Sequence, residues 1–249
     1  MRHATCTLAF GRPGGQTAGM GDVTVRRVDF GYFVRPAEET ETGAARVEPC
    51  LGYLVGHPDG LVLLDTGMGA HPDVDAHYRP RRRDLGTALA GAGAASADVG
   101  LVVNCHLHFD HCGGNPELAG RPVFTQRTEL DAATSADDYT LPDLVDAPGL
   151  RYELLDGEAE ILPGVFVVPT PGHTAGHQSL VVRRPDGTVV VAGQAHDTAT
   201  AYSADVLAWR ALRDGPAPGV PVPPGWLDRL MELDPARVLF AHDHAVWEP

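Results

Sequence analysis

Three histidines and one aspartate fall within six residues of this sequence, at His106, His108, Asp110 and His111. They directly follow the apolar run 101–103, which is typical of a short buried strand. Side chains two apart on an extended segment share a face, so His106 and His108 can converge on one ion. Asp110 and His111 follow where the chain turns and can point at a second, neighbouring ion. Because imidazole and carboxylate are ligands that Zn²⁺ and similar ions take, the spacing indicates a metal centre.

Two later segments place a histidine just after a predicted strand. The apolar run 165–168 leads through a Pro-Gly turn to His173. Near the end of the chain, the apolar run 238–241 leads to His242, and His244 follows two residues later. Because His242 and His244 share one face of an extended segment, His244 stays an alternative to His242. Three separated segments therefore each place a histidine just after a strand.

These segments resemble the metal-binding motifs of the metallo-β-lactamase superfamily. The first matches its H-x-H-x-D-H signature, and the run 106–115 is similar to the H-L-H-F-D-H-x-G-G-N of the N-acyl homoserine lactonases. The likeness extends to Gln-Arg-Thr-Glu at 126–129, to the P-G-H-T-x-G-H-Q-S segment at 171–179 and to the terminal His-Asp. The resemblance runs from about residue 50 to the C-terminus. It implies an α/β fold, the αββα metallo-β-lactamase sandwich, with the metal site at one edge of its two sheets.

The resemblance also assigns metal ligands. It implies three histidines for a first ion, an aspartate and two histidines for a second, and one further ligand between the ions. The matching residues are His106, His108 and His173 for the first ion, Asp110, His111 and His242 for the second, and Gln194 between them. His177 would be a structural hydrogen-bonding residue. Asp65, in a D-x-G turn after the run 61–64, would either support the ligating histidines or be a plain turn residue.

One position departs from the family pattern. Family members usually place an aspartate that bridges the two metals after the strand 189–191, and this chain has Gln194 there. An amide offers one neutral oxygen, whereas a carboxylate offers a charged bridge. The lactonases carry a tyrosine three residues further on, and here Asp197 takes that place. Asp197 could bind metal, act as an acid or base, or simply cap a loop, and the second metal could be weakly held.

The chemistry that the resemblance implies is hydrolysis of a small-molecule lactone or similar ester, such as an acyl homoserine lactone, by a metal-activated water. We expect Zn²⁺ as the cofactor, one ion bound tightly and a second more weakly, with iron or manganese as alternatives. Asp110 would orient the nucleophile, and Asp197 would protonate the leaving alkoxide. Two other functions would share these ligands: a glyoxalase II-like thioesterase, and a non-hydrolytic metal-binding or redox member of the superfamily.

The elements that must position these residues follow from the hydrophobic pattern. Strands are predicted at 23–34, 51–55, 61–64, 101–103, 122–124, 151–155, 165–168, 179–182 and 188–192, with a hairpin turn at Asp186-Gly187. Helices are predicted over 84–97, capped by Asp84, and from residue 126. Residues 134–150 are expected to be loop. The run 199–224, with its irregular Gly- and Pro-rich part at 215–221, is expected to be a lid over the pocket or a plain linker. This order favours an α/β layered domain with the strands inside.

Composition limits the partners and the setting. We expect one domain over residues 23–249, preceded by a loose arm over 1–22. The 19 basic residues are all arginine, and with 33 acidic residues they give a net charge of −14, which disfavours nucleic acid. No apolar run reaches the ~18 residues of a membrane span. The four cysteines show neither a disulfide nor a metal-binding spacing, so we expect a cytoplasmic protein.

Overall fold

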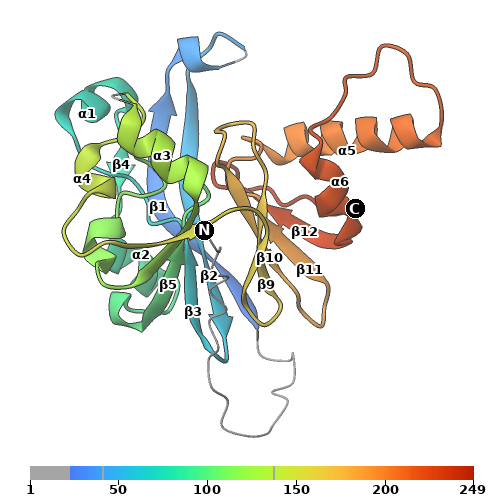
Figure 1. Cartoon of the computed structure of the whole chain (residues 1–249). Coiled ribbons are helices and arrows are strands. Elements are labelled where there is room, and N and C mark those ends of the chain that lie inside the picture. Colours follow the sequence, from blue (N-terminus) through green and yellow to red (C-terminus); the bar gives the residue numbers. More distant parts are fainter. Residues whose placement is uncertain (1–22, 41, 137) are drawn as a thin grey trace, which may run out of the picture.

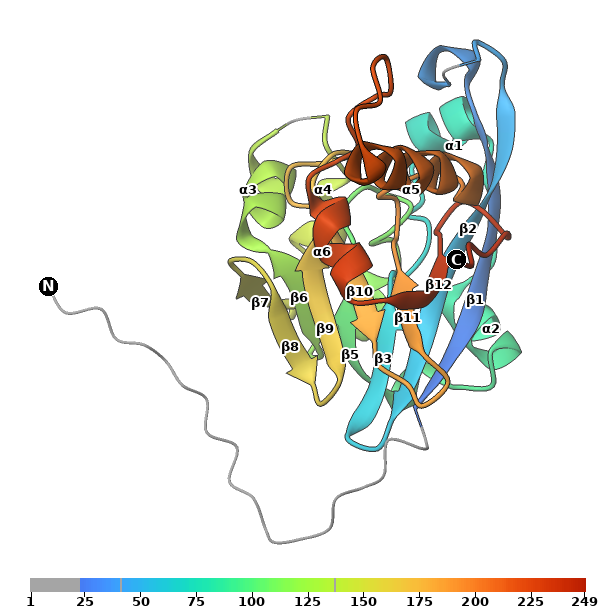
Figure 2. The same ribbon diagram turned by 90° about the vertical axis from the view of Figure 1, so that its right-hand side faces the viewer.

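Two β-sheets pack face to face, and helices cover the outer side of each sheet (Figures 1 and 2). The computed structural model describes residues 23–40, 42–136 and 138–249, so the loose arm expected at 1–22 lies outside the described residues. On the side of the first sheet lie α1 (Pro72–Tyr78), α2 (Leu85–Gly91), α3 (Arg127–Ser135) and α4 (Pro142–Val145), and on the side of the second lie α5 (Ala199–Asp214) and α6 (Trp226–Glu232). The αββα sandwich predicted from the motifs is confirmed.

The first sheet is mixed and has, within the described residues, the strand order β4-β1-β2-β3-β5-β6-β7. Its strands are β1 (Thr24–Arg35), β2 (Arg46–His57), β3 (Gly60–Leu64), β4 (Arg81–Arg82), β5 (Val99–Val103), β6 (Pro122–Gln126) and β7 (Arg151–Leu155). β1, β2 and β3 are antiparallel neighbours, whereas β3, β5, β6 and β7 run parallel. The carboxyl ends of β3 and β5 therefore meet at one edge, where the first histidine motif begins.

The second sheet has the order β12-β11-β10-β9-β8 within the described residues. Its strands are β8 (Ala159–Leu162), β9 (Val165–Pro169), β10 (Gln178–Val182), β11 (Thr188–Val191) and β12 (Pro235–Leu239). β9 and β11 are each antiparallel to β10, and β11 is parallel to β12, so β9, β11 and β12 end at the same edge. Gln178 donates a backbone hydrogen bond of 2.8 Å to Cys105 O, which joins this edge to the first histidine motif.

The main core lies between the sheets and follows from the two-residue period of strands. In β2, Leu51, Tyr53 and Val55 face the second sheet, whereas Leu54 faces the helices of the first. Valines of β9 and β11 meet them from the other side. Full burial of each such side chain contributes about 1.5–3 kcal/mol, so the two sheets form a firm base for the loops at their shared edge.

Each predicted strand overlaps a strand of the structure, and Asp186-Gly187 turns the chain between β10 and β11 as expected. The helix predicted over 84–97 is shorter. Asp84 caps α2, since its side chain accepts a hydrogen bond of 2.8 Å from Thr87 N. α2 ends at Gly91, and Gly93 adopts a left-handed φ of 76° that breaks the helical path.

The lid or linker expected over 199–224 was wrong for its first part, which is the helix α5. Thr198 caps this helix by accepting a hydrogen bond from Ala201 N, and Ala199, Tyr202 and Val206 are buried on one face. That spacing is a helical one, and the Gly- and Pro-rich run after residue 214 obscured it. None of the residues 199–224 lines the cavity described below.

Short elements account for the remaining differences. Residues 134–150, expected to be loop, contain the end of α3 and the single turn α4. The strands β4 and β8 and the helices α1 and α6 were not predicted, because a hydrophobic period is hard to recognise in so few residues. In the part of the chain that the structure describes, no helix combines the length and apolarity needed to cross a membrane.

Candidate metal centre

The first ligand group consists of His106, His108 and His173. The segment after β5 supplies His106 and His108, and the turn after β9 supplies His173 from the other sheet. His108 Nδ1 lies 3.0 Å from His106 Nε2 and 3.1 Å from His173 Nε2. Three ring nitrogens thus converge on one point, as the ligands of a single metal ion do.

The second ligand group consists of Asp110, His111 and His242, and all three are buried. His111 Nε2 lies 3.2 Å from His242 Nε2, and Asp110 Oδ2 lies 3.5 Å from each of these nitrogens. The rings of His106 and His111 have centroids only 4.0 Å apart, so the two groups are immediate neighbours. The structure therefore brings together the six residues that the motifs predicted as ligands of two adjacent ions.

The pKa shifts of His106, His173 and Asp110 favour metal binding, whereas that of His111 does not. Burial lowers the pKa of His106 well below its usual range and that of His173 to about 3. Burial alone would raise the pKa of Asp110, but the facing imidazoles of His111 and His242 bring it to about 2. Conversely, the carboxylates of Asp110 and Asp65 overcome burial and raise the pKa of His111. Neutral imidazoles and an ionised carboxylate are the forms that bind metal ions.

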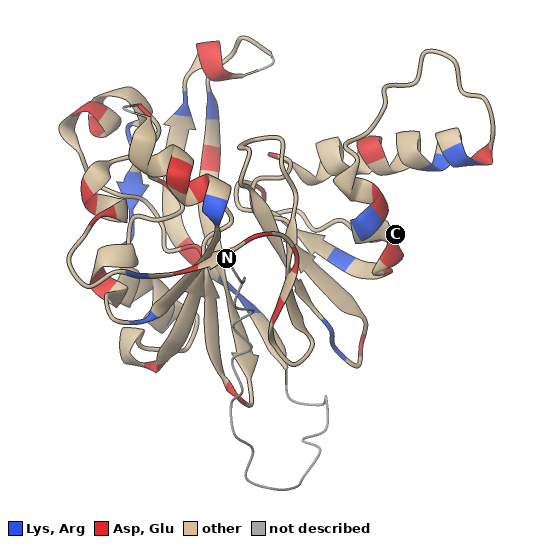
Figure 3. Ribbon diagram, in the orientation of Figure 1, with Lys and Arg blue, Asp and Glu red and all other residues tan. Residues whose placement is uncertain are grey.

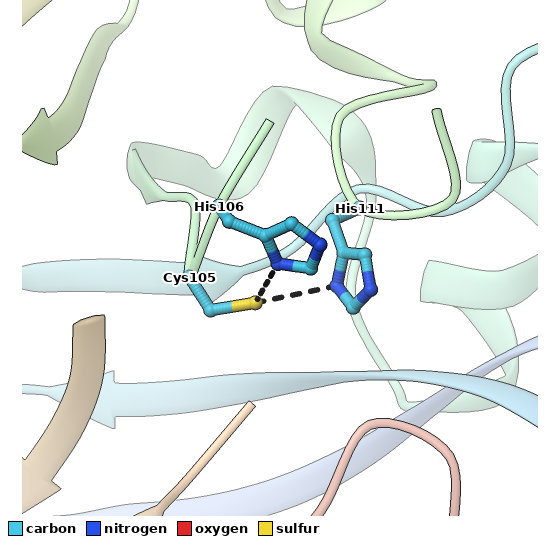
Figure 4. Close-up of side chains that lie close together, drawn as sticks. All are labelled: Cys105, His106 and His111. Atoms are coloured by element: carbon cyan, nitrogen blue, oxygen red, sulfur yellow. Dashed lines mark hydrogen bonds between the residues drawn. The ribbon is translucent and has the colours of Figure 1, made fainter. Parts of the chain in front are cut away.

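Asp65 and Cys105 contact the Nδ1 side of two of these rings. Figure 4 shows the Cys105 sulfur beside His106 and His111. Asp65 Oδ2 lies 2.9 Å from His111 Nδ1, and Asp65 Oδ1 accepts a hydrogen bond of 2.8 Å from Cys105 N. The Cys105 sulfur lies 3.2 Å from His106 Nδ1 and 3.3 Å from His111 Nδ1. Burial raises the pKa of Cys105 well above its usual range, so the group is a thiol. Both residues contact Nδ1 atoms and leave the Nε2 atoms of His106 and His111 free for metal. Asp65 thus contacts a histidine of the second ligand group, in line with the expectation that it supports the ligating histidines.

Gln194 and Asp197, the two residues that differ from the family pattern, form a hydrogen bond with each other. Gln194 lines the cavity, and its Nε2 donates to Asp197 Oδ1 over 3.1 Å. The other carboxylate oxygen of Asp197 accepts a hydrogen bond of 2.9 Å from Arg46. Burial would raise the pKa of Asp197, but the hydrogen bond from Gln194 and the charge of Arg35 lower it. Asp197 lies in neither ligand group.

Sequence reasoning missed a run of alternating charges that we call the charge ladder: Arg35, Glu48, Arg46 and Asp197. Glu48 Oε1 accepts from Arg35 Nε over 2.8 Å and from Arg46 Nε over 2.7 Å, and Arg46 continues to Asp197. Bands of acidic and basic residues mark this end of β1 and β2 in Figure 3. The antiparallel register that pairs Arg35 with Arg46 creates the ladder. Its only sequence signal is the spacing of Arg46 and Glu48 on one strand face.

Sequence reasoning also gave Glu129 no role of its own. This fully buried carboxylate accepts hydrogen bonds of 2.8 Å from Leu107 N and 2.7 Å from Thr174 Oγ1, and a further one from the Tyr139 hydroxyl. Leu107 lies between two histidines of the first ligand group, and Thr174 follows the third. Glu129 therefore ties together the two segments that carry this group.

We expect Glu129→Gln to loosen the first ligand group. One amide oxygen cannot accept all three hydrogen bonds, and its NH₂ would face donors. The variant should lose about 1–3 kcal/mol of stability and bind zinc 10- to 100-fold more weakly at this group. Urea unfolding and zinc titration measure the two effects. Glu117→Gln, an exposed change, should alter neither; unchanged zinc affinity in Glu129→Gln would show that Glu129 does not position the ligands.

The two other histidines near the motifs lie outside both ligand groups. His177 Nδ1 lies 2.8 Å from Thr170 Oγ1, and its Nε2 accepts a hydrogen bond of 3.1 Å from Gln194 N, so it packs as the structural residue that the resemblance implied. His244 is exposed, and its Nδ1 lies 3.1 Å from Arg27 Nη1. The geometry thus favours His242 over His244 as a possible ligand.

A cavity of about 520 Å³ opens onto the ligand groups. His108, Asp110, His173 and Gln194 line it on the side of the ligands. An aromatic wall faces them: the rings of Tyr78 and Phe109 stack with centroids 4.9 Å apart, and Phe33 packs edge-on against both. The cavity therefore offers an apolar surface beside possible metal sites, as a pocket for a small organic substrate does.

The fold and the paired ligand groups define the class of this protein. The sequence model of the metallo-beta-lactamase superfamily matches residues 45–242, and the chain belongs to that superfamily.

Its relatives include N-acyl homoserine lactonases. The chain is 31% identical to the enzyme of Bacillus cereus over 156 residues, which are 57% of this chain and 62% of that protein. It is 28% identical to AttM of Rhizobium johnstonii over 230 residues, which are 82% and 86% of the two chains. The matches to the Bacillus enzymes thus span about six-tenths of those proteins.

Solved structures repeat this likeness. A quorum-quenching N-acyl homoserine lactone hydrolase superposes with a TM-score of 0.70 at 25% identity, over 88% of this chain and 92% of that chain. AidC, a dizinc quorum-quenching lactonase, superposes with a TM-score of 0.66 at 16% identity, over 89% and 88%. At so low an identity the second match shows the fold alone.

Proposed function

We propose that this protein is a metal-dependent hydrolase that opens a lactone or similar ester of the acyl homoserine lactone kind. The observation that carries the proposal is the pair of adjacent ligand groups on one cavity. The similarity to N-acyl homoserine lactonases over 82% of this chain supports the substrate class. The partner would be a small molecule. A cytoplasmic location is proposed as well, because the described cysteines are unpaired, as is usual in a reducing compartment: Cys50, Cys105 and Cys112.

The donor sets fit zinc, with iron and manganese as alternatives. Three neutral imidazoles in the first ligand group, and two imidazoles with one carboxylate in the second, are donors that Zn²⁺ prefers. Bound ions would supply a water activated for attack at neutral pH and would stabilise the negative charge on the carbonyl oxygen. Asp110, ionised and facing the cavity, would accept a hydrogen bond from the attacking water and orient it.

For Asp197 we propose a positioning role in place of the acid role expected from the sequence. Its pKa is lowered, so it holds no proton to give to a leaving alkoxide at neutral pH. As a carboxylate it can only accept hydrogen bonds, so it must take the NH₂ of Gln194. The oxygen of Gln194 is then left for the side of the ligand groups, and Gln194 contributes to the raised pKa of His111. Gln194 would offer the ions a neutral oxygen.

The proposed activity predicts that the zinc-loaded protein opens N-acyl homoserine lactones, because both the metal ligands and the apolar wall suit them. Acid release in a pH-stat measures the reaction, and we expect kcat/KM on the order of 10⁴ M⁻¹s⁻¹ or more for the best acyl chain. A chelator should abolish the activity, and added zinc should restore it.

The same assay distinguishes the alternatives. Rapid cleavage of glutathione thioesters, with no opening of short-, medium- or long-chain lactones, would assign the protein to the glyoxalase II-like thioesterases. The specific observation that favours a non-hydrolytic member is the neutral amide of Gln194 on the cavity that the ligand groups line. Inertness of the metal-loaded protein towards both lactones and thioesters would support that candidate.

A further inference from the structure

Arg35, at the end of β1, places a permanent positive charge on the cavity wall. Among the described residues that line the cavity it is the one arginine, and the chain has no lysine. It lines this cavity together with Asp110 of the second ligand group and with Gln194. The ligand chemistry proposed so far assigns it no task.

The guanidinium of Arg35 is fixed by its inner side. Its Nε donates to Glu48 Oε1 over 2.8 Å, and its Cζ lies 5.4 Å from the centroid of the Phe33 ring. Only 12% of the side chain is exposed. Within the described chain neither terminal nitrogen makes a hydrogen bond, although Nη1 forms a long ion pair of 3.6 Å with Glu39 Oε2. The two terminal nitrogens are therefore available to an acceptor in the cavity.

The rest of the charge ladder explains why this arginine is rigid. Glu48 is buried, and its Oε1 also accepts from Arg46, which is held in turn by Asp197. The ladder thus runs from the cavity wall to the residue that holds Gln194. A guanidinium fixed in this way loses little conformational freedom when it binds, and its flat pair of N–H groups matches the two oxygens of a carboxylate.

We propose that Arg35 binds a carboxylate of the substrate, so that a lactone or ester with an anionic group beside the cleaved bond is a better substrate than a neutral N-acyl homoserine lactone. This proposal rests on the hydrolase function proposed above. The chain has a net charge of −14, and the cavity is also lined by Asp73 and Asp138. The positive charge of Arg35 is therefore what would hold an anionic group in this cavity. Arg35 would thereby set specificity.

The kinetic test compares two substrates that differ only in a carboxylate, such as a carboxylated lactone and its methyl ester. Arg35→Gln should raise KM for the carboxylated lactone about 10- to 100-fold more than KM for the methyl ester, with little difference in kcat between the two substrates. Arg35→Lys, which keeps the charge, should lie in between, and the exposed change Arg210→Gln should have no effect. An equal fall of kcat on both substrates would overturn the proposal and show that Arg35 acts on the reacting carbonyl oxygen.

Direct binding tests the same claim without turnover. In calorimetry with the zinc-loaded protein, glutarate should bind at least about 10-fold more tightly than monomethyl glutarate, and Arg35→Gln should remove that preference while its melting temperature shows a folded protein. Equal binding of the two probes by the natural sequence would overturn the proposal. A preference that persists in a protein inactive on every ester would refute the hydrolase function while retaining the carboxylate site.

Discussion

Replacing His106 by alanine is expected to remove most of the metal held by the first ligand group and to lower kcat/KM by at least about 10²-fold. His106 is fully buried, and its Nε2 lies 3.0 Å from His108 Nδ1 at the point where the ligand nitrogens converge. An alanine leaves two imidazoles, too few to hold the ion, and it also opens a void beside Cys105. Elemental analysis after dialysis and the pH-stat lactone assay measure the two losses.

His244→Ala is the matched control for this experiment. His244 lies two residues from a proposed ligand, but it is exposed and contacts Arg27 rather than either ligand group. Its removal should leave metal content and turnover unchanged. Full metal occupancy with undiminished turnover in His106→Ala would contradict the assignment of the first ligand group.

Gln194→Asp is expected to tighten the second, weaker ion by at least about tenfold. Two divalent ions about 3.5–4 Å apart repel each other, and an anionic ligand between them offsets that repulsion. In the natural sequence residue 194 is a neutral amide that lines the cavity with Asp110, and its NH₂ donates a hydrogen bond to Asp197. Aspartate is one methylene shorter than glutamine, so its carboxylate would lie farther from Asp197 than the amide of Gln194 does. Zinc titration of the metal-free protein by calorimetry measures the affinities of both sites.

Two neutral variants separate charge from shape in this titration. Gln194→Asn has the size of the aspartate without its charge and should not tighten the second ion. Asp197→Asn should leave both affinities within a few-fold, because Asp197 lies outside the ligand groups and an asparagine oxygen can still accept from Gln194. Marked loosening in Asp197→Asn would show that Asp197 is itself a ligand.

The ligand groups were accessible from the sequence because each member belongs to a short local motif. Strand ends such as Val103 and Pro169 are marked by the apolar runs before them, and the histidines follow within a few residues. The αββα topology then brings the motifs to one edge. Periodicity alone did not reveal α5, since its buried positions Ala199, Tyr202 and Val206 are spread over a helix of mixed composition.

The residues around the ligands were not accessible in this way, because their roles depend on contacts between distant segments. Arg35 meets Glu48 only through the register of β1 against β2, and the ladder reaches Asp197 across 151 residues of sequence. Glu129 likewise joins Leu107 to Thr174, 22 and 45 residues away. A local motif shows which residues can be ligands. It does not show which buried carboxylate from a distant segment will hold them in place.

The number of zinc ions that each chain holds is the most direct test of the account. Elemental analysis of the protein after loading with excess zinc should give about two ions per chain, and prolonged dialysis should leave about one, because the site with the neutral amide releases its ion first. Less than one ion per chain after loading would contradict the metal centre itself, and two ions retained equally through dialysis would contradict the role given to Gln194.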